Sequence, residues 1–449
     1  MRSTLRLLAA VLGLPLLALV TATLTRSYAT TEATQSLTHE ALLAGGIGLL
    51  LSGAIWGAER LVKRHFALLW RLFAPLLWLT LATALLLVPL HAALLLHSIW
   101  AILFFVTTIR NELVLMATGF LLIGLALYLY GTVSAAFYIV WALIRSFRHQ
   151  RYRPAGALAT PETYPRLWEL VRVIAGRLGC PPPDQIILLL ESDLFVTEQP
   201  VWFGNERRTG RTMALSLSAM HLLTEAEFSA VIAHEMAHLG ARDTALLHRY
   251  APILHRSKQI YQFLAVKAQN TVFRTLGLLP AMKLLQHFHA SFTRASSSES
   301  RKREYAADAA SLGFVPARVI GAALVKLHAA SETWGDVIHR FWNGSRPVDN
   351  GARLFAALAR QAATPERIAD LTGKTVAHPF DTHPSLHERL TALDLTLAAA
   401  SDGIDLEPAD AAIALVPDAE ELEEALTEGV REWVRLTWND QWWRYRGPR

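Results

Sequence analysis

Long apolar runs fill the first third of the chain and constrain the fold more than any other feature. Four of them, Leu5 to Leu24, Ala41 to Ala58, Leu72 to Ile109 and Leu113 to Ile144, contain a single charged side chain, that of Arg6. A helix crosses the ~30 Å hydrocarbon core of a membrane with about 20 residues. Each run is close to that length or exceeds it, so we predict transmembrane helices in this region.

The positions of basic residues decide the number of spans, because Lys and Arg accumulate on the cytoplasmic side. Four spans place Arg2 with Arg6, Arg60 to Arg71, and Arg145 to Arg153 on one side. Dividing the third run at Pro89 and His91 gives five spans and puts the last cluster outside. We therefore predict a multi-pass cell-membrane protein with four spans. A removable signal peptide is the alternative for the first run, and His91 and His97 are expected in an interfacial loop.

Charges, prolines and turn residues become frequent after Arg145, which indicates a water-facing part. We expect a membrane domain over residues 1–150, a second domain over 151–400 and a helical, Trp-rich tail over 401–449. The net charge of +5 is modest, and its basic residues cluster at membrane flanks, so nucleic acid is not an expected partner. Cys180 is the only cysteine, which excludes an internal disulfide and a Cys-based zinc site.

Local patterns predict the elements of the second domain. Pro154 to Pro165 resembles a linker, Tyr164 to Leu178 an amphipathic helix and Ile186 to Leu190 a buried strand. Met213 to Leu217 resembles a sheet-edge strand along which an extended substrate could bind, and a strand that is simply part of the core is an equally good interpretation. Thr224 and Glu227 form a capping-box pattern. A helix should therefore extend from Glu225 to about Arg242.

That helix contains His234-Glu235-Met236-Ala237-His238. Histidines four residues apart share a helix face, so both imidazoles can reach one ion at ~2.0–2.1 Å. Glu235 points ~100° away from His234 and can reach a metal-bound water without becoming a ligand. The alternative is an amphipathic helix with solvated His and Glu, but polar groups among apolar neighbours need a partner. The motif predicts one Zn²⁺ per chain, with Glu235 as general base.

A zinc site of this kind needs a third protein ligand and an open position. Ala241 and Thr244 stand where a metzincin has its glycine and its third histidine, so we expect a carboxylate from another helix. Glu304 and Asp308 share a helix face. One can bind the ion while the other accepts the remaining N–H of a ligand histidine. From spacing alone, a solvated acidic pair is an equally good interpretation.

With these residues the chain resembles the HtpX and CAAX prenyl endopeptidase family of integral membrane zinc metalloproteases. The resemblance extends from about Leu194 to Leu390. It depends on three motifs in family order: His234-Glu235-x-x-His238 followed by Asp243, Arg303 to Asp308, and Thr382-His383-Pro384 with Arg389.

The resemblance also implies roles for these residues. His234, His238 and Glu304 would bind zinc, Glu235 would be the catalytic base, and Asp308 would support the ligands. His383 would lie near the metal and stabilise the oxyanion, with Arg389 as its neighbour or as a substrate contact. From the residues alone, His383 is more simply a loop histidine before a proline.

The fold class expected is mainly α with a small β-sheet: N-terminal transmembrane helices followed by a zincin-like α+β catalytic domain that faces the cytoplasm. The expected activity is hydrolysis of peptide bonds in membrane or membrane-associated proteins by a zinc-activated water. Partners would be a protein or peptide substrate and the lipid bilayer. The alternatives are a dedicated processing peptidase and a non-catalytic zinc-bearing membrane scaffold or sensor, which the intact Glu235 argues against.

Three segments remain open at this stage. Phe195 to Glu198 departs from the family pattern before the edge strand. His248 to Ser300 has too many basic residues for a full crossing, so an interfacial helix around Thr271 to Phe292 is expected. The Trp-rich tail suits a membrane interface, a protein partner or packing onto the catalytic domain.

Overall fold

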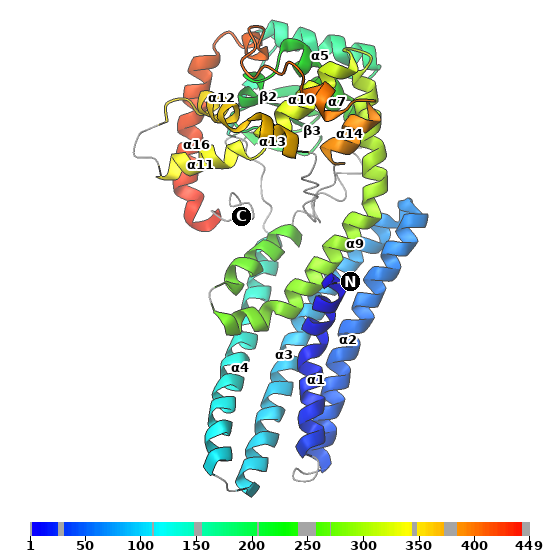
Figure 1. Cartoon of the computed structure of the whole chain (residues 1–449), viewed down its shortest axis with the longest axis vertical. Helices are drawn as coiled ribbons and strands as arrows, with labels where there is room; N and C mark the ends of the chain where they lie inside the picture. Colours follow the sequence, from blue (N-terminus) through cyan, green and yellow to red (C-terminus); the bar gives the residue numbers. More distant parts are fainter. Residues whose placement is uncertain are drawn as a thin grey trace. The chain divides into compact units, whose positions relative to one another are not determined.

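The structure is a computed structural model that describes residues 2–25, 31–109, 112–147, 155–203, 206–240, 257–269, 271–343, 348–371 and 384–441. The chain forms two compact units. A helical unit comprises Met1–His149 and Arg249–Ser296, and an α+β unit comprises Gln150–His248 and Ser297–Arg449. The helices and strands of each unit are labelled in Figure 1.

Four long helices build the first part of the helical unit: α1 (Arg2–Thr25), α2 (Thr31–Arg64), α3 (Leu69–Ile109) and α4 (Glu112–Phe147), with a 3-10 turn at Phe66–Leu68. All four are long and apolar enough to cross a membrane. The described residues thus contain the four predicted helices that could span a membrane, and the mainly α fold class is confirmed.

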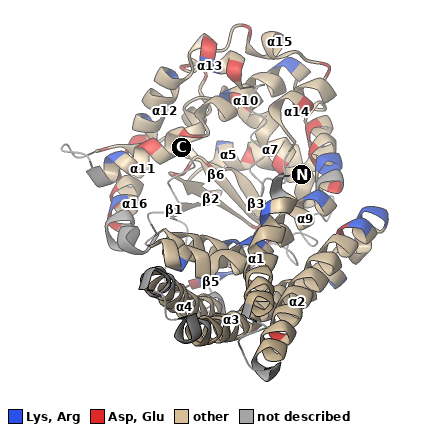
Figure 2. Cartoon of the chain, turned by 60° about the horizontal axis from the view of Figure 1, so that its bottom comes forward, with Lys and Arg blue, Asp and Glu red and all other residues tan. Residues whose placement is uncertain are grey.

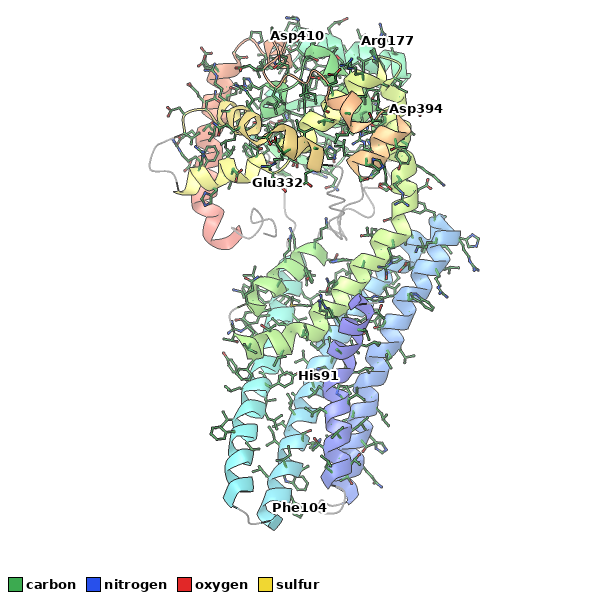
Figure 3. The ribbon with its side chains drawn as sticks, viewed as in Figure 1. His91, Phe104, Arg177, Glu332, Asp394 and Asp410 are labelled. Carbon is green, nitrogen blue, oxygen red and sulfur yellow. The ribbon has the colours of Figure 1, made fainter. Side chains whose placement is uncertain are left out.

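The third run is one continuous helix despite Pro75 and Pro89, so the predicted loop around His91 and His97 is wrong. A proline removes one backbone hydrogen bond, and in a long apolar helix the neighbouring turns and helices compensate for that loss. His91 is buried in α3 (Figure 3). His97 pairs instead with α2, its Nδ1 lying 2.8 Å from Oε2 of Glu40.

Glycines allow the helices of this unit to approach closely. A Cβ added at Gly48 of α2 would lie 2.1 Å from Cγ1 of Val11 in α1. A Cβ added at Gly131 of α4 would lie 2.0 Å from the carbonyl oxygen of Phe273, and one at Gly277 would lie 2.4 Å from the carbonyl oxygen of Gly131. Small residues at such crossings let two backbones come into contact, as is common between membrane helices.

The second part of the helical unit is a helix over residues 257–268 and the N-terminal part of α9 (Val272–Ser311). The interfacial helix predicted from Thr271 to Phe292 is thus the first half of a longer helix, whose residues from Ser297 onward belong to the α+β unit. Within the helical unit, α9 crosses from α4 to α2 (Figure 1), contacting Gly131 at one end and Glu59 at the other.

A four-stranded sheet forms the centre of the α+β unit, in the order β1 (Gly156–Ala159), β2 (Gln185–Leu189), β6 (Thr212–Ser216) and β3 (Phe195–Thr197). Strand β2 pairs antiparallel with β1 and parallel with β6, which pairs antiparallel with β3. A separate hairpin joins β4 (Val201–Phe203) and β5 (Glu206–Arg208).

The buried strand predicted at Ile186 to Leu190 is confirmed, but two neighbouring predictions are wrong. The segment predicted as a linker contains β1, which is too short to show alternation in the sequence. The strand predicted at the edge, β6, lies inside the sheet with all five residues buried. The edge on this side is β3.

Successive residues of the strands point to opposite faces of the sheet. Ile186 and Leu188 belong to the main core with Val171 of α5 (Pro165–Leu178) and Ile232 of α7 (Glu225–Gly240). Ile187 and its neighbours form a smaller cluster on the other face. Helix α5 begins with a proline in its first turn and ends at Gly179, whose φ of 64° is favourable for glycine, as the predicted boundary requires.

The remaining helices surround this core. They are α6 (Leu217–Met220), α10 (Ala317–Ala330), α11 (Thr333–Asn343), α12 (Gly351–Ala362), α13 (Pro365–Asp370), α14 (Leu386–Ala392), α15 (Leu397–Ser401), a 3-10 turn (Ala412–Leu415) and α16 (Ala419–Gln441).

The first half of the tail helix α16 packs on the α+β unit. Val430 belongs to its main core, and the fully buried carboxylate of Glu423 accepts hydrogen bonds from His221 at 2.7 Å and Asn350 at 2.7 Å. Of the interpretations left open for this tail, packing therefore applies to its first half. The tryptophan side chains from Trp433 onward lie outside the described residues.

Candidate metal centre

Helix α7 orients the two histidines of the motif because its beginning and its buried face are both fixed. The predicted capping box is present: the Thr224 amide donates to Oε2 of Glu227 at 2.8 Å, and the Glu227 amide donates to Oγ1 of Thr224 at 3.1 Å. Phe228, Ile232 and Met236 are fully buried in the core. With that face fixed, the histidine rings project from the same side of the helix.

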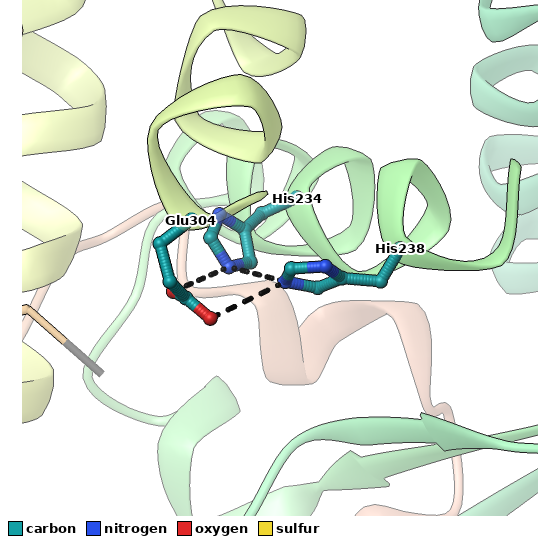
Figure 4. Close-up of side chains that lie close together, drawn as sticks. All are labelled: His234, His238 and Glu304. Atoms are coloured by element: carbon teal, nitrogen blue, oxygen red, sulfur yellow. Dashed lines mark hydrogen bonds and ion pairs between the residues drawn. The ribbon is translucent and has the colours of Figure 1, made fainter. Parts of the chain in front are cut away.

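Helix α9 brings Glu304 to these rings, as Figure 4 shows. The two Nε2 atoms of His234 and His238 lie 3.2 Å apart. Oε2 of Glu304 lies 3.4 Å from Nε2 of His234, and Oε1 lies 3.6 Å from Nε2 of His238. Among the described residues, these three form a group whose potential ligand atoms all lie within 4.8 Å of one another.

The spacing of these atoms fits a metal ion. Ligand atoms held ~2.0–2.1 Å from a tetrahedral ion lie roughly 3.3–3.4 Å from one another. The three distances between ligand atoms, 3.2, 3.4 and 3.6 Å, bracket that value. Two imidazole nitrogens and one carboxylate are also the donors that zinc prefers.

Asp308, one turn after Glu304, orients the first histidine. Its Oδ1 lies 2.9 Å from Nδ1 of His234, which places the ring proton on Nδ1 and leaves the lone pair of Nε2 directed at Glu304 and His238. Burial disfavours the charged imidazolium, but the carboxylates of Asp308 and Glu304 outweigh it and raise the pKa of His234 to about 9. The site thus favours positive charge at this ring.

Arg389, in helix α14, holds Asp308 in place. Its Nε donates to Oδ2 of Asp308 at 2.9 Å and its Nη2 to Oδ1 at 2.5 Å, while Nη2 also lies 3.3 Å from Nδ1 of His234. Although burial raises the pKa of the Asp308 carboxyl, the hydrogen bonds from Arg389 and His234 outweigh it and lower that pKa. The expected neighbour of Arg389, His383, lies outside the described residues.

Glu235 is half-buried on α7 beside the two ligand candidates. Its carboxylate is close enough to act electrostatically on both His234 and Arg389. Glu235 therefore lies within the charged cluster, as its position in the motif predicts, and it does not belong to the group of atoms that could hold the ion.

Two residues that fix the framework of the site were not identified from the sequence. Oγ of Ser311 in α9 donates to the carbonyl oxygen of Ala230 in α7 at 3.0 Å. Nζ of the buried Lys326 in α10 donates to Oε2 of Glu227 at 2.7 Å and to the carbonyl oxygen of Leu222 at 2.9 Å. A lone lysine in the apolar helix α10 is the signal that could have suggested such an anchor.

The segment that carries these motifs resembles known peptidases. Residues 199–396, which include all three motifs, match peptidase family M48. Over this segment the chain resembles HtpX-like members of peptidase family M48. The chain is 28% identical over 240 residues to a protease HtpX homolog of Acidiphilium cryptum. The aligned segment covers 52% of this chain and 75% of that protein. A protease HtpX homolog of Ralstonia nicotianae is 27% identical over 239 residues, or 51% of this chain and 73% of that protein. No solved structure matches the chain.

The match to family M48 confirms the predicted resemblance, and the His-His-Glu group lies inside the matched segment. The match begins at residue 199, just after β3, and ends at residue 396, after α14. It therefore contains α7, the end of α9 and α14, the three helices that carry the described residues of the centre. The M48 family is a metallopeptidase family, so a metal is implied.

Proposed function

We propose that this chain is a membrane-bound zinc endopeptidase that hydrolyses peptide bonds of membrane or membrane-associated proteins. The observation that supports this most is the convergence of three potential ligand atoms at the spacing of a tetrahedral ion. Two of them lie on α7, which begins at a capping box, and the third lies on α9. His234, His238 and Glu304 would hold one Zn²⁺ per chain.

Zinc bound there would polarise a peptide carbonyl and make a water molecule a stronger nucleophile near pH 7. Glu235 would accept the proton of the attacking water and return it to the leaving amine. Asp308 keeps the proton of His234 on Nδ1, and Arg389 prevents the Asp308 carboxylate from rotating away. Arg389 is thus a positioning residue, and His383 remains the candidate for stabilising the oxyanion.

The substrate would bind as an extended strand beside β3. Strand β3 is the last strand in the order of the sheet, and it lies next to α7. A peptide could add to that edge through main-chain hydrogen bonds, which provide affinity without requiring one sequence. This assignment replaces β6, which the sequence suggested for this role.

Four helices that are long and apolar enough to span support a location in the membrane. We propose the cell membrane with the catalytic part facing the cytoplasm, because the basic ends of α1, α2 and α3 would then lie inside. The proposed domains remain 1–150, 151–400 and 401–449. The lipid bilayer and a protein or peptide substrate are the proposed partners, and nucleic acid is not among them.

The decisive experiment compares Glu235→Gln with Glu304→Ala in the purified full chain. Casein hydrolysis and zinc content are both measured, with and without a chelator. Glu235→Gln should retain one zinc per chain and lose cleavage, because it removes the base but no ligand. Glu304→Ala should lose both. A Glu235→Gln variant that still cleaves casein at the rate of the unmodified chain contradicts the proposal. Zinc binding without any cleavage by the unmodified chain indicates a scaffold or sensor instead.

A further inference from the structure

The second part of the helical unit has an unusual charge composition. Residues 257–296 contain five Lys or Arg side chains and no Asp or Glu. The same stretch exposes large apolar side chains at the beginning of α9, with Val272 71% and Leu276 38% exposed. Cations next to exposed apolar residues are typical of helices that lie at the boundary between lipid headgroups and acyl chains.

Two of these cations share one aromatic ring in the C-terminal half of α4. The guanidinium of Arg274 lies 5.2 Å from the ring centroid of Tyr138, and Nζ of Lys267 lies 5.8 Å from it. The Nε of Arg274 is buried and has no hydrogen-bond partner in the parts of the chain that the structure describes. Two like charges at one ring repel each other, so an anion near them would be bound favourably.

A second pair of like charges lies between α1 and α9. Arg6 and Lys283 are close enough to repel one another. Val11 of α1 packs on Gly48 of α2, and the two helices run in opposite directions. Arg6, five residues before Val11, therefore lies beside the part of α2 near Gly53, about one turn before the exposed Trp56. The guanidinium of Arg60 stacks over Trp56 at 3.6 Å, and an exposed tryptophan beside a cation suits the boundary between lipid and water.

The carboxylate of Glu59, at this end of α2, already pairs with two other cations. Glu59 is buried, and both of its oxygens accept hydrogen bonds from Arg294, at 2.8 and 2.7 Å, while Oε1 also accepts one from Lys63 at 2.9 Å. It therefore cannot also neutralise Arg6 and Lys283. Figure 2 shows Lys and Arg positions, in blue, at this end of the α2 ribbon.

We propose that the basic collar of the helical unit, formed by Arg6, Arg60, Lys267, Arg274 and Lys283, binds the phosphate headgroups of anionic phospholipids. A phospholipid fits better than an acidic protein, because the cations alternate with exposed apolar side chains of helices long enough to span a membrane. The collar is independent of the metal centre and of the peptidase activity.

The test measures which lipids the full chain retains. The purified protein is equilibrated with detergent micelles that contain equal amounts of phosphatidylglycerol and phosphatidylcholine, and headgroup analysis gives the ratio that remains bound. The unmodified chain should retain phosphatidylglycerol preferentially, and salt should weaken the preference. Each cation near an anionic surface contributes about a five-fold preference, so Arg274→Gln with Lys283→Gln should reduce the ratio by about ten- to thirty-fold.

Two controls separate charge from folding and from position. Arg274→Lys with Lys283→Arg retains both charges and should retain the preference. Arg353→Gln removes an exposed cation of the α+β unit and should change nothing. Equal retention of the two lipids by the unmodified chain overturns the proposal, as does an unchanged ratio in the double Gln variant. Displacement of lipid by inorganic phosphate beyond that caused by chloride at equal ionic strength would instead assign the collar to free phosphate.

Discussion

Replacing Lys326 by methionine should destabilise the α+β unit more than any surface substitution. The side chain of Lys326 is 2% exposed and that of Glu227 is 8% exposed, and their charged atoms lie 2.7 Å apart. Methionine fills the volume of the lysine stem but leaves Glu227 as a buried carboxylate with no cation in hydrogen-bond contact. The carbonyl oxygen of Leu222 loses its Nζ donor as well.

The expected cost follows from these two losses. Removing one partner of a buried ion pair costs about 3–5 kcal/mol, because the remaining charge is left uncompensated. The lost hydrogen bond to Leu222 overlaps with that cost, so the two are not added. For a domain of 150–250 residues, each kcal/mol lowers Tm by about 2–4 °C. Lys326→Met should therefore lower the Tm of this unit by roughly 6–20 °C.

Thermal unfolding of the zinc-saturated full chain in detergent, followed by circular dichroism, measures this shift. The informative comparison is with the double variant Lys326→Met/Glu227→Gln. Glutamine is neutral and its amide oxygen can still accept from the Thr224 amide, so the double variant should be more stable than Lys326→Met alone. Arg353→Met breaks an exposed pair and should cost less than about 1 kcal/mol.

The ordering of these variants tests the reasoning. If Lys326→Met is as stable as the unmodified chain, the buried pair does not stabilise the beginning of α7. If the double variant is less stable than the single one, the cost comes from lost packing instead of an unpaired carboxylate.

Three further predictions test other parts of the structure. Asp308→Ala should weaken zinc binding about 10- to 100-fold in a chelator competition assay, because the ligand histidine loses its orienting partner; unchanged affinity would contradict that role. Gly131→Ala should lower the Tm of the helical unit, since the new Cβ meets the Phe273 carbonyl, whereas Gly124→Ala has open space and should not; equal effects would argue against the close crossing. Burial, together with the charge of Asp193, raises the pKa of Glu191 to about 7. The protonated Glu191 carboxyl therefore favours the folded state fully below the unfolded pKa near 4.5, and this stabilisation is lost as the pH rises through 7. Glu191→Gln should therefore flatten the fall in Tm between pH 5 and pH 8, and an identical fall in both proteins would refute the assignment.

The convergence of His234 and His238, the two candidate ligands, could be predicted from the sequence because their geometry is local. An i, i+4 pair on a helix that begins at Thr224 and Glu227 places both imidazoles on one face whatever else the fold does. Glu304 required the family resemblance, since the spacing of Glu304 and Asp308 is equally typical of a solvated pair. No local pattern indicates that a helix 70 residues later packs against α7.

The predictions that were wrong concern contacts between distant segments. Strand β6 was predicted at a sheet edge because its hydrophobic pattern alternates weakly, but pairing with β3 depends on how residues 195–197 fold back. The role predicted for Arg389, as a neighbour of His383 or as a substrate contact, stays a prediction because His383 lies outside the described residues. Sequence motifs give an order along the chain and no direction for this side chain. In the fold, α14 turns this guanidinium towards Asp308.

The charge balance at the metal centre connects these residues. Glu235, Glu304 and Asp308 contribute three negative charges and Arg389 one positive charge, which leaves an excess of two negative charges when the histidines are neutral. Such an excess in a mostly buried cluster is costly unless it is compensated. A divalent cation at the three ligand atoms compensates it fully, whereas a proton on His234 compensates only half. The raised pKa of His234 and the fit to a divalent ion therefore have one cause, the surplus of carboxylates that α7 and α9 bring together.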